Sequence, residues 1–285
     1  MATLAALPAI GECRVVNADR PSFVGKPAHP AGHRSKGRGS EGPGGLALPL
    51  VQPASLDDVA LRRGVAVLDA SRDALPTYFA EASLVFAACY PHRITEACLA
   101  ACPGPVVNVH PSRLPRFRGP APIFWQLWAG VRETGATLHR VVSAWDAGPI
   151  IAQSRRAVDA GLAESAISDA LARDGASLFA GSFSGLIAGE APTTAQNEAQ
   201  ADYQSWPSER DFRVASDWTA ERVYRFVRGV AERGIPITYS PGDEPDIKIA
   251  EAIAWADRFD SATLSVGAER RLCFDGGEVD VRLAP

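Results

Sequence analysis

Apolar residues follow two different periods along the first two thirds of the chain. Continuous apolar runs at 65–68, 84–88 and 106–107 have the length and composition of buried parallel strands. Segments 120–130 and 164–188 instead place apolar residues at helical spacing, and the second is rich in alanine. Strands that alternate with helices predict a doubly wound, mostly parallel α/β sheet. Ligands bind such sheets beyond the carboxyl ends of the strands, so the residues that follow each strand are the candidates for chemistry.

The pattern changes after residue 190. The stretch 191–205 is polar and contains proline, which predicts a linker. Beyond it, Thr219 is placed to cap a helix whose buried face has apolar residues at i, i+3, i+4 and i+7: Val223, Phe226, Val227 and Val230. A Gly276-Gly277 turn precedes the last of five strand-like runs, which lie at 235–239, 247–249, 262–266, 272–274 and 279–283. The sequence thus predicts an α/β domain at 1–190, a linker at 191–205 and a small α+β domain at 206–285.

The composition of the 285-residue chain is that of an ordinary globular protein, with 46% hydrophobic and 22% charged residues. A net charge of −4 argues against a protein coated with basic residues. No apolar run approaches the roughly twenty residues of a membrane span, and the start lacks the basic region of a signal peptide, so we expect no membrane association. Five cysteines without Cys-x-x-Cys spacing indicate a reduced, cytoplasmic protein with no metal site.

Two polar side chains follow the apolar run at 106–107. Asn108 and His110 are two residues apart, and in an extended chain residues i and i+2 point to the same face. An amide and an imidazole side by side can polarise a carbonyl group and manage a proton. A polar pair that only satisfies its own hydrogen bonds would give the same pattern. The spacing alone leaves both interpretations open.

The residues around this pair extend it into a longer motif. Asn-x-His at 108–110 is followed by Pro111-Ser112, Leu114-Pro115 and Gly119, then by Gly-x-Thr at 135–137 and Asp-x-Gly-x-Ile at 146–150. This combination resembles the signature of the folate-dependent formyltransferases, the family of the methionyl-tRNA, glycinamide ribonucleotide and amino-sugar formyltransferases. The resemblance implies a Rossmann-like catalytic domain at 1–190 and a short, barrel-like carboxy-terminal domain.

The resemblance also implies a reaction and the residues that perform it. Asn108, His110 and Asp146 would be catalytic in transferring a formyl group from 10-formyltetrahydrofolate to a primary amine, without a metal. Two loops would border the folate, with residues Tyr90, His92, Ile94, Val142, Ser143, Ala144 and Trp145. His139 lies within a predicted strand, where a histidine is more often structural, and we leave it outside the predicted chemistry.

The amino-terminal part departs from the family pattern. Residues 13–16 read as a short strand, but the first strand and glycine-containing turn that precede it in relatives are not seen. We therefore expect either a truncated start or a sheet that lacks its first strand.

Segment 20–40 contains basic and no acidic residues. Its glycines suit a solvated surface loop. It is equally suited to contact the phosphates of tRNA through Lys26, Arg34, Lys36 and Arg38.

The sequence favours no single amine acceptor. The basic segment and the carboxy-terminal domain favour methionyl-tRNA or a related amine, whereas residues 137–140 and Phe124-Trp125 resemble the amino-sugar N-formyltransferases. A non-catalytic member that binds folate or RNA, and a hydrolase that transfers the formyl group to water, are the remaining alternatives.

Overall fold

The computed structural model describes residues 14–18, 59–60, 62–90, 92–242, 245–258 and 268–284. The chain forms two compact units, Met1–Arg72 and Asp73–Pro285. In the first unit, strand β1 (Arg14–Ala18) pairs in parallel with β2 (Ala66–Ala70), which confirms the strands predicted near 13–16 and 65–68. The residues before Arg14, where the first strand was expected to be missing, lie outside the described residues. So do the basic side chains of the possible tRNA contact: Lys26, Arg34, Lys36 and Arg38.

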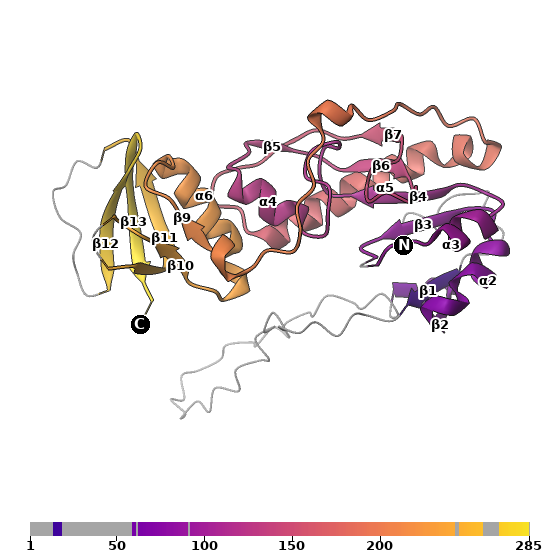
Figure 1. Cartoon of the computed structure of the whole chain (residues 1–285), viewed down its shortest axis with the longest axis horizontal. Helices are drawn as coiled ribbons and strands as arrows, with labels where there is room; N and C mark the ends of the chain where they lie inside the picture. Colours follow the sequence, from indigo (N-terminus) through magenta and orange to yellow (C-terminus); the bar gives the residue numbers. More distant parts are fainter. Residues whose placement is uncertain are drawn as a thin grey trace, which may run out of the picture. The chain divides into compact units, whose positions relative to one another are not determined.

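A four-stranded sheet forms the α/β part of the second unit (Figure 1). Its strands lie in the order β3 (Val85–Ala88), β4 (Val106–His110), β6 (Thr137–Arg140) and β7 (Ile150–Gln153). β3 and β4 are parallel, whereas β6 is antiparallel to both β4 and β7. A two-stranded ribbon, β5 (Glu133–Thr134) with β8 (Arg156–Ala157), lies outside this sheet. The α/β class is confirmed, with a parallel pair at β3–β4 and antiparallel pairs beyond it.

Short helices connect the strands. α2 (Leu75–Ala80) precedes β3, and α3 (Glu96–Ala101) leads from β3 to β4. Thr95 caps α3, because its side-chain oxygen accepts a hydrogen bond from the backbone N–H of Cys98 at 3.3 Å. α4 (Pro122–Trp128) lies inside the helix predicted at 120–130 and has proline in its first turn, where no N–H is needed.

The long helix α5 (Glu164–Ala188) contacts β6 and β7, and its bounds are those predicted from the sequence. It ends at Gly189, whose φ of 74° is costly for other residues. Gly175 in its middle faces the sheet, and a Cβ atom there would lie 2.4 Å from Cγ1 of Val109 in β4. The helix therefore approaches β4 closely only because this position has no side chain.

A second, five-stranded sheet contains the carboxy-terminal residues. Its order is β12 (Glu269–Phe274), β13 (Gly277–Leu283), β11 (Ile247–Ala256), β10 (Ile237–Tyr239) and β9 (Arg213–Val214). Helix α6 (Ala220–Val230) contacts β11 and β13, and Thr219 caps it as predicted, accepting from Arg222 N at 3.2 Å. The predicted hairpin is confirmed as β12–β13. The run expected at 235–239 begins only at Ile237, after a proline that has no N–H for the ladder, and 262–266 lies outside the described residues.

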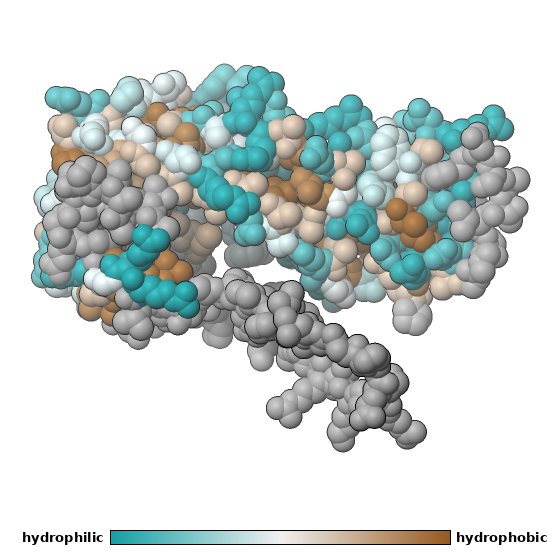
Figure 2. Space-filling model, turned by 180° about the vertical axis from the view of Figure 1, so that it is seen from behind, coloured by the Kyte–Doolittle hydropathy of each residue, from teal (hydrophilic) through white to brown (hydrophobic). Residues whose placement is uncertain are grey.

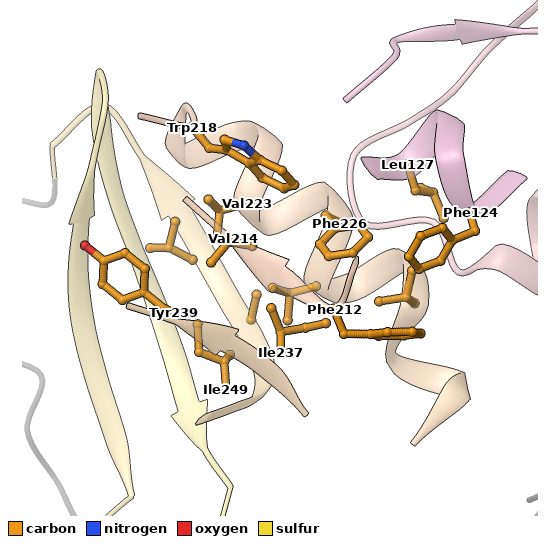
Figure 3. Packing of buried hydrophobic residues seen from close by; sticks show 14 of the residues in the cluster. Phe124, Leu127, Phe212, Val214, Trp218, Val223, Phe226, Ile237, Tyr239 and Ile249 are labelled. Atoms are coloured by element: carbon orange, nitrogen blue, oxygen red, sulfur yellow. The ribbon is translucent and has the colours of Figure 1, made fainter. Parts of the chain in front are cut away.

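One hydrophobic core joins α4 to α6 and the carboxy-terminal sheet (Figure 3). Phe124 of α4 and Phe226 of α6 are both fully buried, and their ring centroids lie 5.6 Å apart. The division into domains at 1–190 and 206–285 stays a prediction, and residues Asp73–Pro285 form one compact unit.

Among the described residues, no helix is long and apolar enough to cross a membrane. On the face shown in Figure 2, hydrophobic residues occur in small groups between hydrophilic ones. Val142 and Trp145 are among the large apolar side chains that remain exposed, and both border the site described next.

Candidate active site

The register between β4 and β6 places an asparagine beside a histidine. Asn108 is paired with His139 across the two antiparallel strands. Directly paired residues point to the same face of a sheet. Their side chains meet there, with Asn108 Nδ2 3.1 Å from His139 Nε2.

Hydrogen bonding and burial determine the protonation state of His139. Its Nδ1 lies 2.8 Å from the carbonyl oxygen of Arg140, which only accepts, so Nδ1 carries a hydrogen. Burial, with a smaller contribution from the neighbouring His110, lowers the pKa of His139 from 6.5 to about 4 against the opposing effect of Asp146. The ring is therefore neutral near pH 7, and its Nε2 lone pair accepts one amide hydrogen of Asn108. The second amide hydrogen of Asn108 is not used by this bond.

Asp146 comes from the turn between β6 and β7 and faces both histidines. Its Oδ1 lies 3.7 Å from His110 Nδ1 and 3.9 Å from His139 Nε2, and both distances are longer than those of hydrogen bonds. Its Oδ2 accepts a hydrogen bond from the backbone N–H of Gly119 at 2.8 Å. Asp146 has a φ of 51°, in the left-handed region that non-glycine residues seldom adopt.

His110 lies behind this cluster and is 4% exposed. Its Nε2 donates to the carbonyl oxygen of Phe117 at 2.7 Å, which leaves Nδ1 directed to Asp146. The structure thus brings Asn108, His110 and Asp146 together, with His110 joined to the others through the carboxylate. Their catalytic roles stay a prediction.

A cleft opens over the cluster. Its lining includes all seven residues expected to border a folate: Tyr90, His92, Ile94, Val142, Ser143, Ala144 and Trp145. Asn108, His139 and Asp146 also line it, whereas His110 does not. The two loops predicted from the sequence therefore face each other across one cleft, and folate binding there stays a prediction.

Two polar lining residues were missed by the sequence analysis. His139 has the pattern of a structural strand residue, and only its pairing with Asn108 reveals its place in the site. Arg93 links the two loops, because its Nε donates to the carbonyl oxygen of Ser143 at 2.9 Å. Arg93 stands between the predicted His92 and Ile94, but nothing in the sequence distinguishes it.

The family model described as formyl transferase matches residues 66–181, which contain every member of this cluster. This stretch of the chain matches the formyl transferase family. Among the curated formyl transferases it matches is the methionyl-tRNA formyltransferase of Staphylococcus aureus (strain JH1), at 29% identity over 172 residues. That alignment covers 60% of this chain and 55% of the relative, so the chain spans about half the length of the curated relatives it matches.

Solved formyl transferase structures share the fold. One is WlaRD, a sugar 3N-formyl transferase solved in the presence of dTDP and 5-N-formyl-THF, with a TM-score of 0.60, 17% identity and coverage of 80% of this chain and 81% of that one. Another is the N-formyltransferase from Helicobacter canadensis in complex with folinic acid and dTDP-3-aminofucose, with a TM-score of 0.62, 16% identity and coverage of 81% and 83%. At these identities the likeness establishes the fold alone. It confirms the Rossmann-like formyl transferase fold with a sheet-rich carboxy-terminal region.

Proposed function

We propose that this chain transfers a formyl group from 10-formyltetrahydrofolate to a primary amine. The observation that carries the proposal is the cluster of Asn108, His110 and Asp146 beside a cleft lined by all seven residues expected at the folate. The match of residues 66–181 to the formyl transferase family model supports the reaction class, and two related structures named above contain formylated folates. A neutral donor and a carboxylate–imidazole pair are the groups that acyl transfer to an amine requires.

Asn108 stabilises the oxygen of the formyl group. Attack by the amine nitrogen forms a new bond to the formyl carbon and moves an electron pair onto this oxygen. The amide hydrogen that His139 leaves unused donates to it. When the bond between the formyl carbon and folate N10 breaks, its electron pair stays on N10. The products are the formylated amine and tetrahydrofolate.

His110 and Asp146 move the proton that this exchange releases. The attacking amine becomes cationic and must lose a proton, while N10 must gain one. In our proposal the Asp146 carboxylate, which lines the cleft, relays the proton to Nδ1 of His110 and then stabilises the imidazolium, while Phe117 continues to accept from Nε2. The same proton then returns through Asp146 to N10, so that the step is balanced.

We further propose methionyl-tRNA or a related amine as the acceptor. The methionyl-tRNA formyltransferases among the sequence relatives support this choice. An amino-sugar nucleotide is the second candidate, because the two sugar N-formyltransferases named above cover about four fifths of both chains.

A turnover assay tests the reaction and the acceptor together. The purified chain is given 10-formyltetrahydrofolate with methionyl-tRNA, an amino-sugar nucleotide or water alone, and release of tetrahydrofolate is followed with the formylated product. We expect release that depends on one of the two amines. Formate release without an amine would identify a hydrolase, and no release under any condition would contradict the proposal.

The cluster is tested by replacing Asn108, His110 or Asp146 with alanine. We expect each variant to lower turnover at least about a hundred-fold, the usual cost of losing one oxyanion donor, with folding intact. Double variants should lose less than the product of the single losses, because the three residues act as one unit. Asp159→Ala removes an exposed carboxylate outside the cluster and is the control. A folded Asp146→Ala enzyme with near-normal turnover would contradict the assignment.

A further inference from the structure

Residues 196–204, which lie inside the predicted linker, pack along the loop that follows β4. After α5 the chain turns back to β7, where Thr194 and Ile150 exchange two backbone hydrogen bonds of 2.8 Å (Figure 1). Further on, Arg118 N donates to the carbonyl oxygen of Asp202 at 3.1 Å, and Gln204 N donates to that of Arg118 at 2.9 Å. A Cβ atom on Gly119 would lie 2.0 Å from the oxygen of Gln204, so only glycine permits this approach.

Two strained residues of the active site are each held by a side chain of this segment. Phe117 and Asp146 have φ values of 59° and 51°, and they account for two of the three non-glycine residues with positive φ in the described chain. Such conformations are energetically costly and persist only where neighbouring groups fix them. Gln196 binds the backbone of Asp146, and Asp202 binds that of Phe117.

Gln196 uses its whole amide on this contact. Its Nε2 donates to the carbonyl oxygens of Asp146 and Gly148, both at 2.7 Å. Its Oε1 accepts from Arg118 Nη2 at 2.8 Å and Nε at 3.2 Å. Arg118 is 8% exposed and is held in turn by Glu198, with its Nη2 2.7 Å from Oε1. The turn that carries the Asp146 carboxylate is thereby tied to a buried arginine that Glu198 also holds.

Asp202 acts on the other side of the cluster. Its Oδ1 accepts a hydrogen bond from the backbone N–H of Phe117, whose own carbonyl oxygen accepts from His110 Nε2 at 2.7 Å. Phe117 therefore connects Asp202 to the His110 ring, and the position of the ring depends on Asp202 through it. Neither Gln196 nor Asp202 lines the cleft.

We infer that Gln196 and Asp202 are positioning residues for the formyl transfer reaction. Gln196 fixes the carboxylate of Asp146, and Asp202 fixes the imidazole of His110. The inference rests on the proposed function, since it assigns the two residues to that reaction. It makes the 196–204 segment part of the active-site framework.

The test of Gln196 is the variant Gln196→Glu. The new carboxylate still accepts from Arg118 but has no hydrogen to give to Asp146 or Gly148. We expect kcat to fall about tenfold or more with KM for the folate changed less than about twofold, because small displacements of catalytic groups affect the chemical step. Asn197→Ala is the matched control: it removes the hydrogen bond that Asn197 Oδ1 accepts from Ala199 N in the same segment and touches neither loop. Equal turnover in the two variants would overturn the role of Gln196.

Asp202 is tested by a pair of variants. Asp202→Asn keeps the oxygen that accepts from Phe117, whereas Asp202→Ala removes it. We expect near-normal kcat for asparagine and a loss of about tenfold or more for alanine. Equal losses in both would show that the charge of Asp202 matters rather than its acceptor oxygen, and would overturn the inference.

A measurement without substrate separates this inference from the proposed function. In the free protein we expect the NMR resonances of the His110 ring to move in Asp202→Ala, and those of the Asp146 turn to move in Gln196→Glu. They should stay in place in Asp202→Asn and Asn197→Ala. Unmoved resonances in Asp202→Ala and Gln196→Glu would overturn the positioning role even for an active enzyme. An inactive wild-type protein with the expected shifts would overturn only the proposed function.

Discussion

At the scale of single residues, the protonation of His139 determines how Asn108 is oriented. Because Nδ1–H of His139 is held by the carbonyl oxygen of Arg140, Nε2 must accept. Asn108 must then present its NH2 group rather than its oxygen to the ring. The neutral histidine thus leaves one amide hydrogen of Asn108 outside this bond, which suits the oxyanion role that we propose for Asn108.

This arrangement predicts a dependence of stability on pH. The pKa of His139 is lowered to about 4 in the folded state by burial, so the unfolded chain binds more protons between about 4 and 6.5. The free energy of unfolding should therefore fall as the pH drops through this window, with at most about 1.4 kcal/mol per pH unit from this group. Urea unfolding of the wild type and His139→Gln at pH 7, 6 and 5 measures the difference. Parallel pH dependences of the two proteins would contradict it.

The residues of the site differ in how far the sequence could predict them. Asn108 and His110 lie two apart in one strand, so their common face follows from local geometry. The roles of Asp146 and of the two loops were predicted from the resemblance to the family. His139 lies 31 positions from Asn108, and their contact depends on a strand register that no local pattern contains. Gln196 and Asp202 were missed because the polar stretch that contains them has the composition of a linker.

At the scale of elements, the contact between α5 and β4 lies directly under the site. Gly175 faces Val109, the residue between Asn108 and His110 in β4. The backbone that carries both side chains is therefore supported by the helix at this point.

Two glycines of the same helix allow a matched test of this contact. Gly181→Ala has no atom within 4 Å of the new Cβ and should raise the free energy of unfolding by about 0.5–1 kcal/mol, the gain in helix propensity. Gly175→Ala brings the same gain but forces Cβ against the stiff side chain of Val109, which costs about 1–3 kcal/mol. We expect it to be net destabilising in urea unfolding. Similar stabilisation by both substitutions would show that α5 can move away from β4 without cost.

Long helices and helices with a recognisable capping residue were the elements that the sequence predicted best. α5 has 25 residues and a glycine at its end, and α6 has a threonine cap, so both were predicted from the sequence. α2 and α3 have 6 residues each, which is too short for a helical period to be recognised, and β9 has only 2.

At the scale of the larger unit, Asp73–Pro285, the shared core is the main feature. The alternation of strands and helices predicted its α/β class, but not that α4 would pack against α6. Gly229 permits this packing, because a Cβ atom there would lie 2.7 Å from Cδ2 of Leu127. The formyl transferase fold and the carboxy-terminal sheet are thus linked by apolar packing as well as by the chain.

The shared core predicts that both parts unfold together. Phe226 is fully buried between Phe124 and Trp218, with ring centroids 5.6 Å from each. Phe226→Ala should lower the free energy of unfolding by about 3–5 kcal/mol in a single transition, followed by tryptophan fluorescence and far-UV circular dichroism. Tyr224→Ala, which removes a partly buried ring from the same helix, should cost less. Two separate transitions, with only one shifted by Phe226→Ala, would contradict a common core.

The contacts of residues 196–204 also determine where this chain can be recombined with its relatives. A chimaera joined at residue 190 would take Gln196 and Asp202 from one parent and their partners Asp146 and Phe117 from the other. A crossover placed after Trp206 keeps both pairs within one parent. Any exchange of tails intended to transplant acceptor preference should therefore cut beyond this point, and should match the parents at Leu127 and Gly229, where the new tail must fit against α4.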